Sequence, residues 1–450
     1  MRITRTSRTF NASPLALVAV PVCLLALGLV TPANSQALSD FDRDRGHIML
    51  NNIKGEIKKS YYDPTFHGID LEARFKTANE KVDRATSNGQ VFGIIAQVLI
   101  EFEDSHLVFY PPQRSTKGDY GWQMQMFGDN CYVSAVKPGS DAESKGLKPG
   151  DLVKSLDGYT PARENMWKLK YLYYALRPQP GMRLVLESPG GPERQVDVMA
   201  KIIQGKQRLD LTGGGGGNDI WDLIRESENE DRLRRHRYVE MGDDLMIWKM
   251  PQFDLDAAGV SDKIGKAKKR KALILDLRGN PGGYEETLKN LLGYFVDHEV
   301  KIGDIKRRKE TKPLMVKARD DRFKGKLVVL IDSESGSSAE IFARMIQMEK
   351  AGTVIGDRSA GAVMRAKAYS FQIGADVAIF YAASITDADL IMTDGKSLER
   401  VGVTPDELLL PSAADLAAKR DPVLARAAAL VGVKLEPEKA GALFPVEWRK

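Results

Sequence analysis

The chain has 450 residues, of which 43% are hydrophobic and 28% are charged. This length suits about two to four domains, and the composition excludes a chain that is disordered throughout. The formal net charge of +5 falls close to neutral once the three arginines of an N-terminal leader are removed. Near-neutrality argues against nucleic-acid binding, which depends on clustered positive charge.

The first 37 residues have the pattern of a secretory signal peptide. Arg2, Arg5 and Arg8 precede an apolar run over 15–30, and small residues around Ser35 to Ala37 provide a cleavage site. An uncleaved membrane anchor is the alternative, although the run is short for a span of roughly 20 residues. We predict a periplasmic or secreted protein with a signal peptide over 1–37 and no stable membrane insertion after its removal.

The sequence shows no motif typical of a metal site or a nucleotide site. Cys131 is the one cysteine left after the leader, so no intramolecular disulfide is expected. The five histidines show neither an H-x-x-x-H spacing nor a cysteine partner, and the glycine run 213–217 lacks a G-x-x-x-x-G-K motif. We therefore expect no metal and no cofactor.

Hydrophobic patterning divides the mature chain into parts. Apolar residues recur at helical spacing from Phe92 to Phe102, whereas short β-like runs between glycine and proline turns follow. Beyond the glycine linker, apolar strands alternate with amphipathic helices, which indicates an α/β core with mainly parallel strands. The predicted parts are an N-terminal helical domain over 38–115, a β-rich domain over 116–204, an α/β core over 218–411 and a helical tail over 412–450.

The β-rich part contains a recognisable succession of turns. A short helix at 139–145, a Gly-Leu turn, Pro149-Gly150-Asp151 and a strand ending in Asp157-Gly158 follow one another. This succession resembles a PDZ domain, and PDZ domains take an extended peptide as an added strand. The resemblance implies that a loop of Gly121, Trp122, Gln123 and Met124 binds the peptide, or that the domain serves as a spacer or lid.

A strand over 327–331 enters a turn of small residues that leads directly into a helix. Ser337 stands at this corner, where a hydroxyl can be exposed close to backbone N–H groups. The helix N-terminus adds partial positive charge, which favours a developing oxyanion. Ser337 to Glu340 also read S-x-x-E, the capping box that starts many ordinary helices.

Three further segments accompany this motif in a fixed order. The strand 273–277 runs into 278–283 (Arg-Gly-Asn-Pro-Gly-Gly), 354–357 reads Val-Ile-Gly-Asp, and 394–406 closes the series. The order resembles the C-terminal processing peptidase and tricorn family of serine proteases over nearly all the mature chain. The resemblance implies a crotonase-like α/β protease core, with an N-terminal helical domain and an inserted PDZ domain, in which Ser337 is the nucleophile.

A serine hydroxyl needs a base, because its own pKa leaves it a poor nucleophile at neutral pH. Many bacterial family members use a lysine just after the turn that here spans 356–361, but the next residue is Ala362. Lys367 is nearby at an unmatched offset. His106, in Asp104-Ser105-His106, resembles the Asp-x-His segment of tricorn-type members, whose histidine is the base. The resemblance therefore favours His106.

The resemblance also supplies the remaining site residues. Glu399 is the expected carboxylate that orients the imidazole, with Asp406 as an alternative, and Ser105 is the expected fourth member that holds the carboxylate. Expected oxyanion donors are the backbone N–H groups of Ser338 and of Gly282 or Gly283, since glycine has no Cβ to obstruct a substrate carbonyl.

We therefore predict an exported serine endopeptidase that cleaves peptides or proteins through an acyl-enzyme, with a PDZ domain that binds or gates substrates. Two alternatives stay open. A catalytically inactive ligand-binding protein on the same fold is one, and a peptide-binding PDZ scaffold is the other.

Overall fold

The computed structural model describes residues 38–112, 116–176, 178–204, 232–374 and 378–448. The predicted signal peptide 1–37 and the glycine run 213–217 lie outside the described residues.

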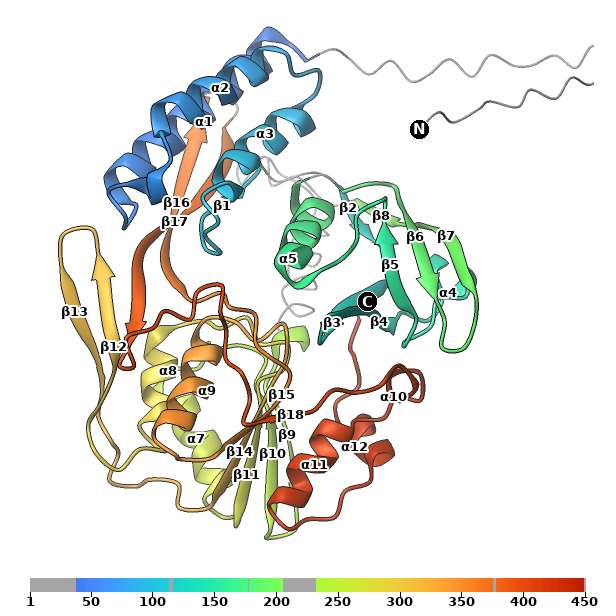
Figure 1. The fold of residues 1–450 in the computed structure, drawn as a ribbon, viewed down its shortest axis with the longest axis vertical. Helices are drawn as coiled ribbons and strands as arrows, with labels where there is room; N and C mark the ends of the chain where they lie inside the picture. Colours follow the sequence, from blue (N-terminus) through green and yellow to red (C-terminus); the bar gives the residue numbers. More distant parts are fainter. Residues whose placement is uncertain (1–37, 113–115, 177, 205–231, 375–377, 449–450) are drawn as a thin grey trace, which may run out of the picture. The chain divides into compact units, whose positions relative to one another are not determined.

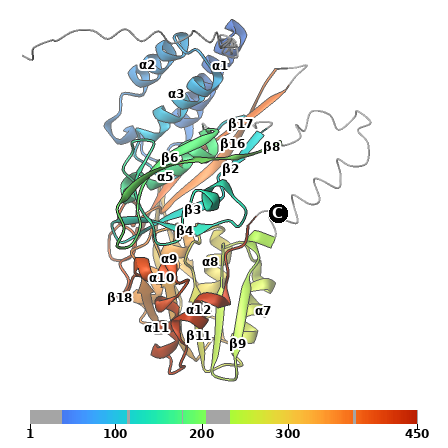
Figure 2. The same ribbon diagram turned by 90° about the vertical axis from the view of Figure 1, so that its right-hand side faces the viewer.

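Three helices open the described chain: α1 (Asp40–Ser60), α2 (Leu71–Asp83) and α3 (Asn88–Ile100). The side chains of Ser39, Asp70 and Ser87 each accept a backbone N–H at the start of one helix. The buried faces of these helices share one hydrophobic cluster with residues of two long strands, β16 (Met364–Ile373) and β17 (Ile379–Met392). Figures 1 and 2 show both strands reaching these helices.

β17 is the centre of a five-stranded antiparallel sheet that the sequence patterns do not predict. One edge of β17 pairs with β16. Its other edge pairs with β1 (Val108–Tyr110) over residues 382–384 and with β12 (Val300–Arg307) over residues 388–392. β12 pairs in turn with β13 (Thr311–Val316). Because β1 begins two residues after His106, its pairing with β17 fixes the place of that histidine.

A second five-stranded sheet lies in the β-rich part, in the order β3-β4-β5-β6-β7. Its strands are β3 (Trp122–Phe127), β4 (Asn130–Val136), β5 (Leu152–Leu156), β6 (Gly181–Glu187) and β7 (Glu193–Met199). The short helix α4 (Asp141–Ser144), the helix α5 (Arg163–Tyr171) and a π-helical turn (Leu172–Leu176) accompany it, and β2 (Thr116–Asp119) pairs with β8 (Lys201–Gln204). β3 is an edge strand, since β4 is its one partner among the described strands.

The α/β part contains a six-stranded sheet in the order β18-β15-β14-β11-β10-β9. All neighbours are parallel except β9 and β10, in agreement with the predicted α/β core of mainly parallel strands. The strands are β9 (Arg237–Met241), β10 (Leu245–Lys249), β11 (Ala272–Asp276), β14 (Lys326–Ile331), β15 (Thr353–Gly356) and β18 (Glu407–Leu408).

Helices cover both faces of this sheet (Figure 1). Leu273 and Leu275 of β11 face the side covered by α7 (Ala257–Ala267), α8 (Glu285–Leu292) and α9 (Ser338–Met348), whereas Ile274 faces α11 (Pro422–Leu430). The tail also forms α10 (Ala413–Ala417) and α12 (Pro437–Leu443). Two buried faces explain why the strands read as continuous apolar runs.

Candidate active site

Ser337 lies at the sharp turn between β14 and α9. Its φ of 52° and ψ of −120° are unusual for a residue with a side chain. The backbone N–H of Ser337 donates to the Ala362 carbonyl at 2.9 Å and to Glu340 Oε2 at 3.0 Å. These two bonds fix the strained conformation from outside the turn, as a strained functional residue requires.

The turn after β11 is tied to the turn that carries Ser337. Gly336 N–H donates to the Asn280 carbonyl at 2.9 Å, and Gly279 N–H donates to Asp332 Oδ1 at 2.9 Å. Gly282 adopts φ 100°, and a Cβ there would lie 2.6 Å from the Cβ of Ser337. The two turns follow neighbouring parallel strands, so they meet at the carboxyl edge of the sheet, where open α/β sheets bind ligands.

His106 is positioned by the segment that precedes β1. Its backbone N–H donates to Asp104 Oδ1 at 2.9 Å. Asp104 is buried and also accepts hydrogen bonds from Thr386 Oγ1 at 2.8 Å and from the Tyr61 hydroxyl at 3.0 Å. A buried carboxylate is stable only when its oxygens have such donors. Asp104 therefore joins the His106 segment to β17 and α1.

A chain of hydrogen bonds connects His106 with Glu399 through Ser105. Ser105 Oγ lies 2.8 Å from His106 Nδ1 and donates to Glu399 Oε2 at 2.9 Å. Glu399 also accepts the N–H of Ser105 at 2.9 Å and the N–H of Val363 at 2.8 Å. The carboxylate therefore acts on the imidazole through a hydroxyl, whereas a triad carboxylate contacts the histidine directly.

Burial shifts the pKa of both groups. Loss of solvent lowers the pKa of His106, and the negative charge of Asp104 partly opposes this. Burial raises the pKa of Glu399 to about 7, and its hydrogen bonds to Ser105 and Val363 limit the rise. At neutral pH His106 is therefore a neutral imidazole, the form that can accept a proton.

Glu340 is fully buried at the start of α9 and accepts four hydrogen bonds. Its donors are Ser337 N–H (3.0 Å), Ala362 N–H (2.9 Å), Gly361 N–H (2.7 Å) and Ser359 Oγ (2.6 Å). Burial raises the pKa of Glu340 to about 7 in spite of these donors. In turn, Val403 N–H donates to Ser359 Oγ at 2.6 Å. The helix-capping glutamate thus links the Ser337 turn to the loop of Glu399.

Ser337 and His106 line one pocket of about 480 Å³. No hydrogen bond joins their side chains in the described structure; in enzymes without substrate, catalytic hydrogen bonds are often long. Gly282, Gly283 and Ser338 line the same pocket. Glu399 instead lines a neighbouring pocket of about 320 Å³, on the other side of the hydrogen-bonded chain.

The predicted oxyanion donors differ in their availability. Gly282 N–H donates to Asn280 Oδ1 at 2.8 Å, which favours Gly283 over Gly282 among the two expected donors. Within the described hydrogen bonds, the N–H groups of Gly283 and Ser338 have no acceptor. These two groups, at the starts of α8 and α9, are the donors left for a substrate oxygen.

The alternative base and alternative carboxylate lie elsewhere. Lys367 is on β16 with an exposed amine 3.7 Å from Asp387, and it does not line the pocket of Ser337. Asp406 accepts Val354 N–H at 2.8 Å and a hydrogen bond from Gln347 at 2.8 Å, so it fixes the start of β15 to α9.

The four residues of the predicted peptide-binding loop are mostly strand. Trp122, Gln123 and Met124 begin β3, and the buried side chains of Trp122 and Met124 belong to the core of the sheet. Gly121 N–H donates to Asp119 Oδ1 at 3.0 Å, so it is not a free donor for a carboxylate. Gln123 lines a pocket of about 930 Å³ together with residues of the α/β part and the tail.

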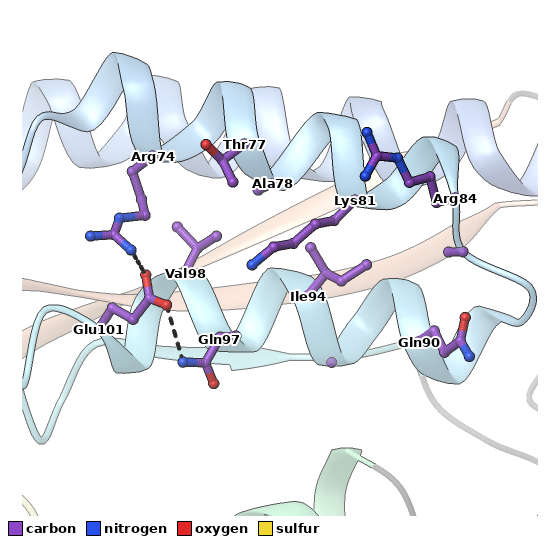
Figure 3. Close-up of a pocket in the computed structure, with 12 residues that line it drawn as sticks. Arg74, Thr77, Ala78, Lys81, Arg84, Gln90, Ile94, Gln97, Val98 and Glu101 are labelled. Carbon is purple, nitrogen blue, oxygen red and sulfur yellow. Dashed lines mark hydrogen bonds and ion pairs between the residues drawn. The ribbon is translucent and has the colours of Figure 1, made fainter.

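A further groove of about 410 Å³ runs between α2 and α3 (Figure 3). Arg74 forms an ion pair with Glu101, and Glu101 also accepts a hydrogen bond from Gln97 at 3.1 Å. Lys81 and Ile94 lie along the groove. None of its lining residues is a serine, cysteine or histidine.

Across the described ranges, no three histidine, cysteine, aspartate or glutamate side chains gather as metal ligands would. The helices within those ranges include none with the length and apolarity needed to span a bilayer.

Sequence reasoning missed Asp104, Glu340 and Thr386 as contributors to the site. Asp104 belongs to the Asp-Ser-His motif and Glu340 to the S-x-x-E motif. The motifs marked these positions, but they did not indicate that the two carboxylates hold the site together. Thr386 carries no local signal, because its role depends on a strand pairing that brings residues 282 positions apart together.

Comparisons with known proteins agree with this geometry. The model of Peptidase family S41 matches residues 245–409. The chain is 24% identical over 401 residues to the carboxy-terminal processing protease CtpA of Bacillus subtilis (strain 168), which covers 84% of this chain and 73% of the relative. It is 26% identical over 304 residues to the tail-specific protease of Haemophilus influenzae, over 64% of this chain and 39% of the relative.

Among solved structures, mature CPAF superimposes with a TM-score of 0.61 at 16% identity, over 84% of this chain and 94% of the other. The complex of mature CPAF with lactacystin gives a TM-score of 0.60 at 15% identity, over 84% and 96%. At these identities the likeness shows a shared fold.

Proposed function

We propose that this chain, whose residues 245–409 match the model of Peptidase family S41, is a member of that family and an exported endopeptidase with Ser337 as nucleophile and His106 as base. The observation that carries the proposal is that Ser337, His106 and the unused N–H groups of Gly283 and Ser338 line one pocket. A serine, an imidazole and two convergent donors are the parts that acyl transfer needs.

In the proposed reaction, His106 Nε2 accepts the Ser337 proton while Ser337 Oγ attacks the peptide carbonyl. The N–H groups of Gly283 and Ser338 stabilise the resulting oxyanion. The imidazolium then gives its proton to the leaving amine, which leaves an ester on Ser337. Water, deprotonated by His106, attacks the ester and releases the acid and the free serine.

Ser105 and Glu399 stabilise the imidazolium in this scheme. When His106 is charged, Nδ1–H donates to Ser105 Oγ, and Ser105 donates to Glu399. Ionised Glu399 thus stabilises the positive charge through one intervening hydroxyl. Because the pKa of Glu399 is about 7, this stabilisation grows as the pH rises through neutrality.

Replacement of Ser337 by Ala tests the nucleophile. We expect the variant to lose labelling by a small alkyl fluorophosphonate and to lose peptide cleavage, while the thermal unfolding temperature stays close to that of the wild type. Labelling of Ser337→Ala at the wild-type rate contradicts the assignment. A wild-type protein that neither labels nor cleaves favours the ligand-binding alternative.

We also propose the domain division of the sequence patterns: a signal peptide over 1–37, a helical domain over 38–115, a PDZ domain over 116–204, a crotonase-like core over 218–411 and a tail over 412–450. Mass spectrometry of the mature N-terminus tests the first: cleavage after Ala37 is expected, and an intact N-terminus in the exported protein contradicts it.

The PDZ domain is proposed to gate the site, because its edge strand and its helix contact the loop just before Ser337. Ser333 Oγ donates to the Met126 carbonyl at 2.6 Å, and Gln125 donates to Asp332 Oδ2 at 2.6 Å. Lys170 of α5 forms an ion pair with Glu334. A peptide added to the free edge of β3 competes with Ser333 for the Met126 carbonyl.

Lys170→Ala removes one of these contacts, and Lys168→Ala on the same helix is the control, since it lacks a contact with this loop. We expect Lys170→Ala to change basal turnover and its response to an added peptide with a free C-terminal carboxylate, each severalfold, and Lys168→Ala to change neither. Identical responses in both variants contradict gating.

A further inference from the structure

The pocket of Ser337 has an extended apolar wall beyond the groups that the reaction uses. Five aliphatic side chains form it, each from a different helix or strand: Leu288, Ile305, Leu314, Ile341 and Leu390. All are buried except Ile305, which is half-buried. Such a concave apolar surface beside a reactive serine binds an apolar group.

The wall starts where a substrate carbonyl would sit. Ile341 stands three residues after Ser338 on α9, and Leu288 stands five residues after Gly283, within the first turn of α8. Residues three or four apart on a helix share a face. Since these four residues line the same pocket, a carbonyl held by the N–H groups of Ser338 and Gly283 would place the side chain on the acyl side of the cleaved bond near Ile341 and Leu288.

The charged residues of the pocket are partnered. Glu285 accepts a hydrogen bond from Arg365 at 3.2 Å, and Arg365 also lies 3.8 Å from Asp387. Asp389 accepts a hydrogen bond from the Ser397 hydroxyl at 2.9 Å. A charged substrate side chain would lose water here against five aliphatic groups, a cost that only a new ion pair offsets.

The volume admits a large side chain. A cavity of about 150 Å³ lined by aliphatic and aromatic residues takes up benzene, and this pocket is about 480 Å³. We propose that the pocket selects a large apolar residue, such as leucine, methionine or phenylalanine, on the acyl side of the cleaved bond. This proposal rests on the proposed role of Ser337.

Peptidyl diphenyl phosphonates test the preference without requiring turnover, because they react with the active-site serine and carry the side chain of interest next to phosphorus. A series with one peptide and leucine, phenylalanine, alanine, glutamate or lysine at that position is compared by the rate of mass increase at Ser337. We expect leucine and phenylalanine to react at least about 10-fold faster than alanine and about 100-fold faster than glutamate or lysine.

Equal rates across the series, or a faster reaction with alanine or lysine, overturn the preference. A small alkyl fluorophosphonate separates this failure from failure of the proposed function. If it labels Ser337 while the phosphonates fail to discriminate, the preference alone is wrong. If it does not label Ser337, the proposed function is wrong as well.

Ile305→Arg places a cation in the pocket from β12, and Met315→Arg is its matched control. Met315 follows Leu314 on β13, is 37% exposed and does not line the pocket, as strand alternation requires. We expect Ile305→Arg to slow the leucine phosphonate at least about 10-fold and to speed the glutamate phosphonate, and Met315→Arg to change neither. Unchanged selectivity in Ile305→Arg overturns the proposal.

Labelling of Ser337 by the small fluorophosphonate shows whether the site has folded in each variant, and Met315→Arg is expected to label at the wild-type rate. If Ile305→Arg does not fold, Leu314→Ala takes its place. It enlarges the pocket, and the expected result is a shift of the preference from leucine toward phenylalanine. An unchanged ratio of the two rates in Leu314→Ala overturns the proposal.

Discussion

The turn of Ser337 and the segment of His106 lie at one pocket but are built in different ways. Ser337 follows a parallel strand and starts a helix, and the two acceptors of its own N–H, Glu340 and Ala362, lie within 25 residues of it. Its turn is also tied to the turn after β11, since Gly336 donates to Asn280. His106 depends on partners much farther along the chain, since Asp104 binds Thr386 and Ser105 binds Glu399. The proposed nucleophile is therefore held by segments nearer in sequence than those that hold the proposed base.

The largest expected effect tests whether His106 is the base. We expect His106→Ala to lower kcat/KM by about 10⁴-fold or more, since removal of a triad histidine has effects of that size. Lys367→Ala is the control, because Lys367 pairs with Asp387 outside the pocket, and it should leave kcat/KM within twofold. Peptide hydrolysis by both purified variants decides the matter, and the reverse pattern assigns the site to a serine–lysine dyad.

Glu340→Gln tests how the turn of Ser337 is held in place. The amide would turn an N–H₂ group toward the N–H of Ser337 or Gly361, so at least one bond that fixes the turn is lost. We expect kcat to fall about 10- to 100-fold, as loss of a hydrogen bond to a charged group allows, with KM within about twofold. Glu340→Asp should restore less than full activity because its carboxylate is shorter.

A purely structural role of Glu340 predicts another result: a lower unfolding temperature with unchanged kcat in the folded fraction. Steady-state kinetics on protein quantified by fluorophosphonate labelling separates the two roles. An unchanged kcat would limit Glu340 to helix capping.

Ser105→Ala tests the hydrogen-bonded chain from His106 to Glu399. Its hydroxyl joins His106 to Glu399, so we expect kcat to fall about 10-fold. The hydrogen bond from Ser105 lowers the pKa of Glu399, and its removal raises that pKa further. We expect the acidic limb of the wild-type kcat profile to follow the ionisation of Glu399, and in Ser105→Ala this limb should move to higher pH. Rates measured from pH 5 to 9 show this, and an unmoved limb argues against the relay.

Glu399→Gln removes the ionisable group at the far end of this relay, so we expect a pH-dependent effect on stability in addition to a lower kcat. The pKa of Glu399 is about 7 in the folded protein against 4.5 for the free side chain. Between these values the folded state retains a proton that the unfolded state releases, so rising pH removes stability from the wild type, and the loss is complete above pH 7.

The variant lacks this titration. Its free energy of unfolding relative to the wild type should therefore improve by about 3 kcal/mol from pH 4.5 to pH 8. Urea unfolding at several pH values measures the difference. A constant offset at every pH would mean that Glu399 is already ionised in acid.

Local patterns were sufficient for much of the α/β part. The alternation of apolar strands and amphipathic helices predicted β11, α8, β14, α9 and β15, because burial on both faces of a parallel sheet leaves continuous apolar runs. The small-residue turn predicted the corner at Ser337, because the residues that permit a sharp strand-to-helix turn are adjacent in the chain.

Other features had no local signal. The five-stranded sheet around β17 depends on pairing between segments as distant as β1 and β17, and edge-to-edge hydrogen bonds are made by the backbone of any residue. The choice between Gly282 and Gly283 as a donor depended on Asn280, whose side chain uses one of the two N–H groups.

The sequence by itself determined the alternation of strands and helices in the α/β part, the serine corner and, through a family resemblance, the candidates for the base and the carboxylate. Only the tertiary structure decided that Ser105 stands between His106 and Glu399, that Asp104 and Glu340 hold the segment of His106 and the turn of Ser337, and that an aliphatic wall borders the serine. Periodicity records which face of an element is buried, whereas contacts between distant segments arise only when those buried faces meet.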